Sequence, residues 1–195
     1  DKSFINTEFW HEETLKIFSA IGIGPALGVD GKTLTSLEKL FAVCENAKIP
    51  MVLDADVFNN LATNKGRAVI KKIPKNSVLT PHPKEFQKLI GKSWKDDFEK
   101  LSFLSQFAIN HEVIICLKGA NTAVAFPDET IHFNSTGNSG MAKAGTGDVL
   151  KGIILALVAQ GYAPKDAASL GVYENGVEGE RAAEKSGQKE MVAGG

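Results

Sequence analysis

The sequence predicts a single α/β domain, with a mostly parallel central sheet and helices on both faces of that sheet. Short apolar runs alternate along the chain with segments of helical periodicity, which is the pattern of parallel βαβ units. No internal repeat, low-complexity tract or Pro/Ser-rich linker divides the 195 residues. A chain of this length buries about 70% of its unfolded surface, so one core stabilises it without disulfide or metal links.

Three strands are predicted in the first half of the chain, at residues 17–23, 51–53 and 77–79. A loop rich in Gly, Pro or Asp follows each strand and interrupts regular structure. The loops begin at Gly24, Asp54 and Thr80. Because ligands bind at the carboxyl ends of parallel strands, we expect polar residues from these loops to converge.

Helices are predicted between and after these strands. The first has apolar residues at helical spacing, namely Leu34, Leu37, Leu40, Phe41, Cys44 and Ala47. A second begins near Lys84, because two prolines define the turn before it. Ser93 with Asp96 resembles a capping box for a third helix. The apolar stripe of that helix is Phe98, Leu101, Leu104 and Ala108.

The second half is predicted to add a strand, a hairpin and two closing helices. The strand covers residues 113–117, and the hairpin joins residues 123–126 to 131–134. One helix runs from about Asp148 to Gln160, and the last begins at Pro164.

Composition and charge exclude several classes of partner. The 22 basic and 23 acidic side chains give a net charge of −1, and no long basic run occurs, so we expect no nucleic-acid or membrane partner. Residues 152–159 form the longest apolar stretch, far shorter than the roughly 20 residues of a membrane span. The two cysteines, Cys44 and Cys116, favour reduced thiols and a cytoplasmic location. A small molecule is the expected partner.

A glycine-rich segment, residues 138–148, lies directly before an apolar helix. Glycines let backbone N–H groups approach an anion, and a helix N-terminus adds partial positive charge, so the segment is a candidate phosphate cradle. It is neither a Walker A loop nor a dinucleotide fingerprint. Asp148 is either a helix cap or a base that takes a proton from a hydroxyl attacking a phosphoryl group. The residue pattern leaves both readings open.

Three further segments carry polar residues at predicted strand ends. Residues 118–122 offer a lysine to a phosphate, or form an ordinary turn. His82, between two prolines, either presents its imidazole to a substrate or caps the next helix. Glu85 is a charge in the first turn of that helix, a partner of another site residue, or a residue that binds a metal through water. Asp54 and Asp56 either hold Mg²⁺ through water or satisfy loop N–H groups.

Taken together, these motifs resemble one family, the NAD(P)H-hydrate dehydratases of the ribokinase-like superfamily. The resemblance extends from about Ile17 to Ala183 and rests on the segments 23–28, 52–56, 79–85, 118–122 and 137–150, which occur in the family's order. Thr80-Pro81-His82-Pro83 and Gly137-Asn138-Ser139-Gly140-Met141-Ala142 make it specific.

The resemblance implies a ribokinase-like fold and a repair reaction. Hydrated NADH or NADPH is dehydrated back to the normal cofactor, with ADP giving AMP and phosphate, or with ATP, in the presence of Mg²⁺. Asp148 is the implied catalytic base, and Gly145, Thr146 and Gly147 the implied anion hole. The implied nucleotide-binding residues are Lys118, Gly119, Ala120, Asn121, Thr122, Asn138 and Gly147. The implied substrate-binding residues are Gly24, His82, Glu85 and Asp148.

The family pattern also differs from this chain. Lys84 and Ala26 stand where glycines are common, and Lys143-Ala144 and Thr146 replace residues often seen as Thr-Gly and Met. Family members have further βα units before Asp1, so we expect the fold to lack N-terminal units and to be incomplete at both ends. A homo-oligomer, often a tetramer, is implied.

Two alternatives stay open. A ribokinase-like kinase of the thiazole or pyridoxal type uses the same Gly-Thr-Gly-Asp chemistry but releases a phosphorylated product, and residues 80–85 argue against it. A non-catalytic nucleotide-binding module retains the cradle without turnover, and Asp148 argues against that.

Overall fold

The computed structural model describes residues 11–137 and 145–186. The strands are β1 (Ile21–Ile23), β2 (Met51–Leu53), β3 (Val78–Leu79), β4 (Ile114–Leu117), β5 (Ala123–Ala125) and β6 (Ile131–Phe133). The helices before β4 are α1 (Glu12–Leu15), α2 (Gly31–Ala47), α3 (Asp56–Leu61), α4 (Gly66–Val69), the 3₁₀ turn η2 (Ile70–Lys72), α5 (Pro83–Ile90) and α6 (Asp97–His111). Two helices follow the hairpin, α7 (Thr146–Ala159) and α8 (Pro164–Ser186).

The strands form one mixed sheet in the order β1-β2-β3-β4-β5-β6. The first four are parallel, and β5 and β6 add an antiparallel hairpin at the edge. The mostly parallel sheet is therefore as predicted. Because β1, β2, β3 and β4 are parallel, the loops that follow them all emerge at the same edge of the sheet.

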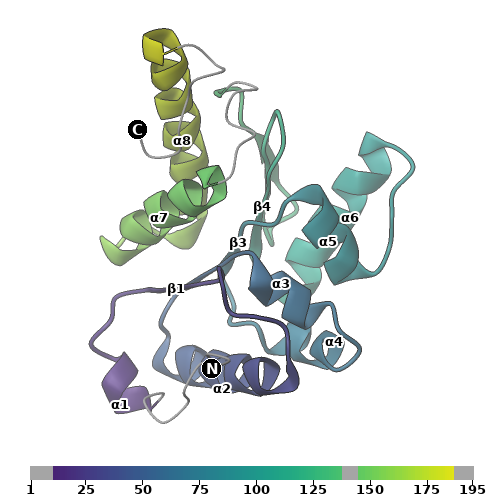
Figure 1. The fold of residues 1–195 in the computed structure, drawn as a ribbon, viewed down its shortest axis with the longest axis vertical. Helices are drawn as coiled ribbons and strands as arrows, with labels where there is room; N and C mark the ends of the chain where they lie inside the picture. Colours follow the sequence, from purple (N-terminus) through teal and green to yellow (C-terminus); the bar gives the residue numbers. More distant parts are fainter. Residues whose placement is uncertain (1–10, 138–144, 187–195) are drawn as a thin grey trace.

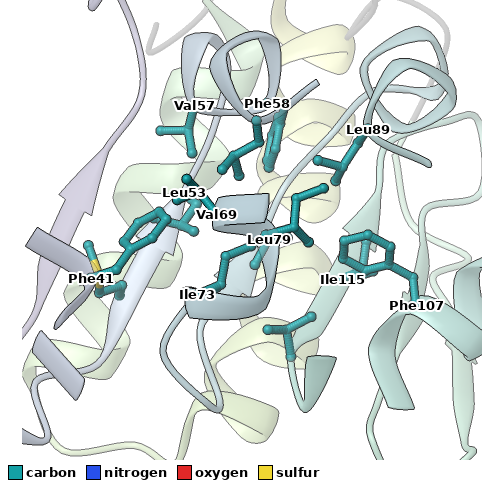
Figure 2. Close-up of a cluster of buried hydrophobic side chains, with 14 of the residues drawn as sticks. Phe41, Leu53, Val57, Phe58, Val69, Ile73, Leu79, Leu89, Phe107 and Ile115 are labelled. Carbon is teal, nitrogen blue, oxygen red and sulfur yellow. The ribbon is translucent and has the colours of Figure 1, made fainter. Parts of the chain in front are cut away.

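Alternating strand residues divide the core between the two faces of the sheet. Leu53, Leu79 and Ile115 face the larger cluster, to which α2, α3, α5 and α6 contribute. Figure 2 shows these three side chains among aromatic and aliphatic residues of that cluster. Val52 and Val78 face the opposite way, toward α7 and α8. The period of two along each strand produces this division.

The helices accordingly cover both faces, as predicted. In Figure 1, α7 and α8 lie together on one side of the sheet, whereas α3, α5 and α6 lie on the other. The N-terminus of α7 lies near the carboxyl ends of the central strands, because a Cβ added to Gly147 would lie 3.1 Å from Lys118 Nζ. This arrangement places a helix N-terminus at the edge where the loops meet.

Three local predictions were wrong. Phe98, predicted in the apolar stripe of α6, is 86% exposed, because this helix packs on the core through later residues, namely Leu104, Phe107 and Ala108. The strand predicted at residues 17–23 begins only at Ile21, and Ile17 is 77% exposed, because the turn after α1 leaves it outside the core. The cap of α6 is Asp96, whose carboxylate accepts from Glu99 N, so Ser93 is not the capping residue.

Both cysteines are free thiols and lie on opposite faces of the sheet. Cys44 belongs to the cluster under α2, and Cys116 to the cluster under α7 and α8. The sheet between them prevents a disulfide, which agrees with the prediction of reduced thiols. Among the helices of the described ranges, none has the length and apolar character to cross a membrane.

Candidate functional site

Polar residues come directly after three neighbouring parallel strands. Asp54 follows β2, Thr80 follows β3 and Lys118 follows β4. The backbone ladder continues through them, since Asp54 N donates to Ile23 O, Thr80 N to Leu53 O and Lys118 N to Pro81 O, each at 3.0 Å. The sheet itself therefore sets the position of all three residues.

Their side chains meet at one oxygen. Asp54 Oδ1 accepts a hydrogen bond from Thr80 Oγ1 at 2.9 Å and lies 3.0 Å from Lys118 Nζ. Asp54 is 3% exposed and Thr80 is fully buried, whereas the lysine side chain is 23% exposed. An ion pair therefore sits at the strand-end edge, with its cationic member nearer to solvent.

The first turn of α7 lies against this ion pair. A Cβ added to Gly147 would lie 3.1 Å from Lys118 Nζ and 4.0 Å from Asp54 Oδ2. Gly145 is the N-cap, with φ +92°, and as a glycine it offers no capping side chain. The first N–H groups of a helix generally have no intrahelical partner and bind anions, and Thr146 and Gly147 stand at this end of α7.

Asp148 lies in the first turn of α7 and is not its N-cap, which decides one alternative. Its backbone N–H donates to Gly145 O at 3.0 Å, and its side chain is 59% exposed. Lys151, one turn on, places its Nζ 3.2 Å from Asp148 Oδ1. The carboxylate is thus solvent-accessible and held by a mostly buried lysine, whose side chain is 14% exposed.

The loop after β4 is exposed beyond its lysine. Gly119, Ala120 and Asn121 face solvent, and a Cβ added to Gly119 would meet no atom within 4 Å. The backbone of Thr122 anchors the end of the loop, since its carbonyl accepts from Asn134 N at 2.9 Å. The loop therefore presents open space next to the Lys118 ammonium.

His82 caps α5, so the helix-capping reading is confirmed. Its Nδ1 accepts from Glu85 N at 3.2 Å, and Glu85 Oε2 accepts from His82 N at 2.8 Å, which completes a capping box. The His82 side chain is still 48% exposed. Because Lys118 N donates to the preceding residue, Pro81, the imidazole emerges from the same edge as the lysine.

Gly24, at the end of β1, allows the backbone of β2 to approach. A Cβ on Gly24 would lie 2.4 Å from Asp54 O, so a larger residue there would force the two strand ends apart. Ala26, two residues on, has φ +58°, in the left-handed region that favours glycine. The loop is tied to α3, because Asp56 Oδ2 accepts from Gly28 N at 3.1 Å.

The residues predicted from separate segments thus come together. Gly24, Lys118 and Gly147 surround Asp54, and His82 emerges beside them. The prediction for Asn138 falls outside the described residues, as does any statement on the side chain of Thr146.

Comparison with known proteins decides the family. The model of the NAD(P)H-hydrate dehydratase family matches residues 3–193. The chain belongs to the NAD(P)H-hydrate dehydratase family. The chain is 40% identical over 183 residues to the bifunctional NAD(P)H-hydrate repair enzyme Nnr of Moorella thermoacetica, covering 93% of this chain and 34% of that protein.

Solved structures agree with this dehydratase assignment. The ADP/ATP-dependent NAD(P)H-hydrate dehydratase of Bacillus subtilis, co-crystallised with ATP/Mg²⁺, is 31% identical with a TM-score of 0.73, over 90% of this chain and 60% of that one. Ribokinase of Arabidopsis thaliana, at 12% identity and a TM-score of 0.61 over 87% of this chain and 52% of that one, shows the fold alone. The fold is ribokinase-like. The chain spans about a third of the bifunctional relative and less than two thirds of the B. subtilis enzyme.

Sequence reasoning missed part of the site of this dehydratase-family chain. The sequence pattern predicts no separate role for Thr80 or Lys151, and it leaves Asp54 as either a magnesium ligand or an acceptor for loop N–H groups. A usable signal was present, since Asp54, Thr80 and Lys118 each follow a buried strand directly. Asp56, in contrast, accepts from the loop through Gly28 N, as the alternative interpretation had it, and from Asn59 Nδ2 within α3.

Proposed function

We propose that this chain catalyses nucleotide-dependent dehydration of hydrated NADH or NADPH back to NAD(P)H. The observation that carries the proposal is the convergence of Lys118, Gly147 and Asp148 at one sheet edge. A phosphate-facing ammonium, a helix N-terminus and an accessible carboxylate are the groups that phosphoryl transfer to a hydroxyl requires. Membership of the dehydratase family supports this substrate.

Each residue has a separate task in the proposed reaction. Lys118 and the N–H groups of Gly145, Thr146 and Gly147 bind the phosphates of ADP or ATP and offset the charge that develops on the transferred group. Asp148 accepts the proton of the substrate hydroxyl as its oxygen attacks the terminal phosphorus. With ADP, the bond to the bridging oxygen breaks and AMP leaves. Phosphate then leaves the substrate, and a proton leaves the adjacent ring carbon, so that the ring double bond re-forms.

The remaining residues of the proposal bind and orient the ligands. The open loop of Gly119, Ala120, Asn121 and Thr122, together with Asn138, contacts the nucleotide. Gly24 and His82, with Glu85 holding the imidazole loop, contact the hydrated nicotinamide. The exposure of the His82 ring and its capping-box anchor support this assignment, because a fixed imidazole loses little entropy on binding.

Magnesium accompanies the nucleotide in this proposal. Within residues 11–137 and 145–186, no group of three His, Cys, Asp or Glu side chains is placed to hold a metal ion. Asp54 is engaged by Lys118 and Thr80, and Asp56 by the loop. Mg²⁺ commonly binds through substrate phosphates with few protein ligands, and its charge offsets that of the phosphoryl oxygens.

The deciding experiment follows absorbance at 340 nm with hydrated NADH, Mg²⁺ and either ADP or ATP. Recovery of absorbance with one nucleotide demonstrates dehydration and identifies the phosphoryl donor. Asp148→Asn should then lower turnover by about 10²- to 10⁴-fold, the usual contribution of a general base, while ADP binding persists. Asp166→Asn, in the first turn of α8, is the matched control. Normal turnover by Asp148→Asn would remove Asp148 as the base.

A kinase or a non-catalytic module would behave differently in the same assay. A small-molecule kinase consumes nucleotide with a hydroxylated acceptor such as a thiazole alcohol, but leaves 340 nm absorbance unchanged. A binding module binds ADP without consuming it. Assembly as a homo-oligomer and the cytoplasmic location stay predictions, and sedimentation velocity measures the first.

A further inference from the structure

We propose that Asp54, supported by Thr80, is a positioning residue that holds the Lys118 ammonium against the first turn of α7, where a nucleotide phosphate binds. The inference rests on the proposed function only in taking a nucleoside diphosphate as the ligand. Asp54 itself does not touch the nucleotide in this account.

The burial of Asp54 is the first argument. A carboxylate at 3% exposure loses most of its hydration, and a buried ion pair seldom stabilises a fold more than apolar side chains of the same volume. The strand residues directly before Asp54, Thr80 and Lys118 are Leu53, Leu79 and Leu117, which are all apolar and buried. Apolar side chains are therefore accommodated next to this position. A charge at this point therefore indicates a task other than packing.

The geometry around Asp54 Oδ1 is the second argument. Thr80 Oγ1 at 2.9 Å and Lys118 Nζ at 3.0 Å share this single acceptor, and the hydroxyl also lies 3.3 Å from Leu53 O. The three residues follow strands that are already locked by backbone hydrogen bonds. The carboxylate is consequently fixed in direction, and so is the ammonium that it binds.

The place to which the ammonium is directed is the third argument. A lysine side chain is a flexible four-carbon stem, and ordering it on binding costs conformational entropy. Asp54 removes that cost beforehand by holding Nζ 3.1 Å from the position that a Cβ of Gly147 would take. A Cβ at this position would press on the ammonium, so the helix and the lysine share one small space at the helix N-terminus.

Charge alone predicts the opposite effect, which makes the inference testable by its sign. Neutralising Asp54 makes the edge more positive and, by Coulomb attraction alone, strengthens the binding of anionic ADP. Loss of positioning weakens it. We therefore expect Asp54→Asn to raise the dissociation constant of ADP about tenfold, with a matching rise in the KM for ADP and a smaller change in kcat. Adenosine, which has no phosphate, should bind as to the unaltered protein.

The experiment is calorimetric titration of the intact protein with ADP and with adenosine, and it needs a matched control. Asp128 offers one, because in the hairpin turn, away from the site, it forms a similar trio with Thr130 of the same turn and Lys165 of α8. Asp128→Asn should leave ADP affinity unchanged. Unchanged or tighter ADP binding by folded Asp54→Asn overturns the inference.

A double-mutant cycle separates positioning from a structural role. Lys118→Met removes the ammonium, so Asp54→Asn in that background should cause no further loss of ADP affinity. A further loss of the same size overturns the inference. If Asp54→Asn does not fold, Thr80→Val replaces it in both tests, and weaker ADP binding with normal adenosine binding is again expected.

Failure of the proposed function is distinguishable in the same set. Wild-type protein that binds ADP but does not restore absorbance from hydrated NADH removes the dehydratase proposal and leaves the role of Asp54 intact. Wild-type protein that dehydrates the substrate, with Asp54→Asn unaffected in KM and ADP affinity, removes the role of Asp54 alone.

Discussion

Gly24 and Asp54 lie in such close contact that a Cβ on the glycine would be 2.4 Å from the aspartate carbonyl oxygen. The two residues follow β1 and β2 directly, and Asp54 N donates to Ile23 O at 3.0 Å. The approach of these two strand ends therefore determines where the Asp54 carboxylate stands. A side chain at position 24 would push the ends of β1 and β2 apart.

Gly24→Ala should lower the free energy of unfolding by about 3 kcal/mol, at the upper end of the range for overpacking, because the colliding atom belongs to the backbone. Urea denaturation measures the loss. Gly31→Ala is the control, since Gly31 is the first residue of α2 and a Cβ there would meet no atom within 4 Å. Equal stabilities of the two variants would contradict the close contact.

Gly147→Ala should weaken ADP binding without lowering stability. The new Cβ would lie 3.1 Å from Lys118 Nζ and displace the ammonium, so we expect about a tenfold higher dissociation constant. Alanine stabilises a helix relative to glycine by up to about 1 kcal/mol, so the melting temperature should hold or rise. Gly152→Ala, in the same helix with no atom within 4 Å, should keep normal ADP affinity. A loss of stability in Gly147→Ala would point to packing instead.

Two variants of His82 should separate its capping role from substrate binding. His82→Asn keeps an N-cap acceptor for Glu85 N but removes the imidazole, so stability should hold while the KM for hydrated NADH rises. His82→Ala should lose about 1 kcal/mol of stability as well, because the cap is gone. Thermal unfolding and steady-state kinetics measure the two effects. Unchanged KM in His82→Asn would leave His82 with the capping role alone.

The buried thiols should make the protein less stable at alkaline pH. Burial raises the pKa of Cys44 to about 11 and that of Cys116 to about 12, whereas both titrate near 9.0 in the unfolded chain. Below pH 9 both states hold the protons, so the full stability is present there. As pH rises above 9, only the unfolded state releases them, and unfolding becomes easier.

The expected slope is about 1.4 kcal/mol of unfolding free energy per pH unit for each thiol, between pH 9 and 11. Urea denaturation across this range measures it. The double variant Cys44→Ala, Cys116→Ala should show a shallower slope, whatever its stability at pH 7. An unchanged slope would mean that the thiols do not control the alkaline limit.

Much of the architecture could be predicted from the sequence because its signals are local. Strand runs such as residues 51–53, the helix after Pro164 and the hairpin around Pro127-Asp128-Glu129-Thr130 are encoded in short stretches of periodicity and turn residues, and the structure has each of them. The exceptions are local as well. Residues 17–20 are apolar in part but belong to no strand. The prediction failed there because nothing in the sequence shows that a turn leaves Ile17 exposed.

The chemical types of the site could be predicted as well, but their partners could not. His82, Lys118 and Asp148 stand at predicted strand or helix ends, where polar residues serve ligands. The pairing of Asp54 with Lys118, 64 residues away, was not predicted. Neither was the pairing of Asp148 with Lys151, since a helical spacing permits an ion pair but does not select it.

The order of strands and helices, the two apolar faces and the residues that punctuate the loops are therefore properties of the sequence, since they depend on neighbours within a few positions. Other features depend on distances between segments that are far apart in the chain. These are the choice of ion-pair partners, the close contacts at Gly24 and Gly147, and the exposure of His82. Only the parallel sheet, which brings its strand ends to one edge, establishes those distances.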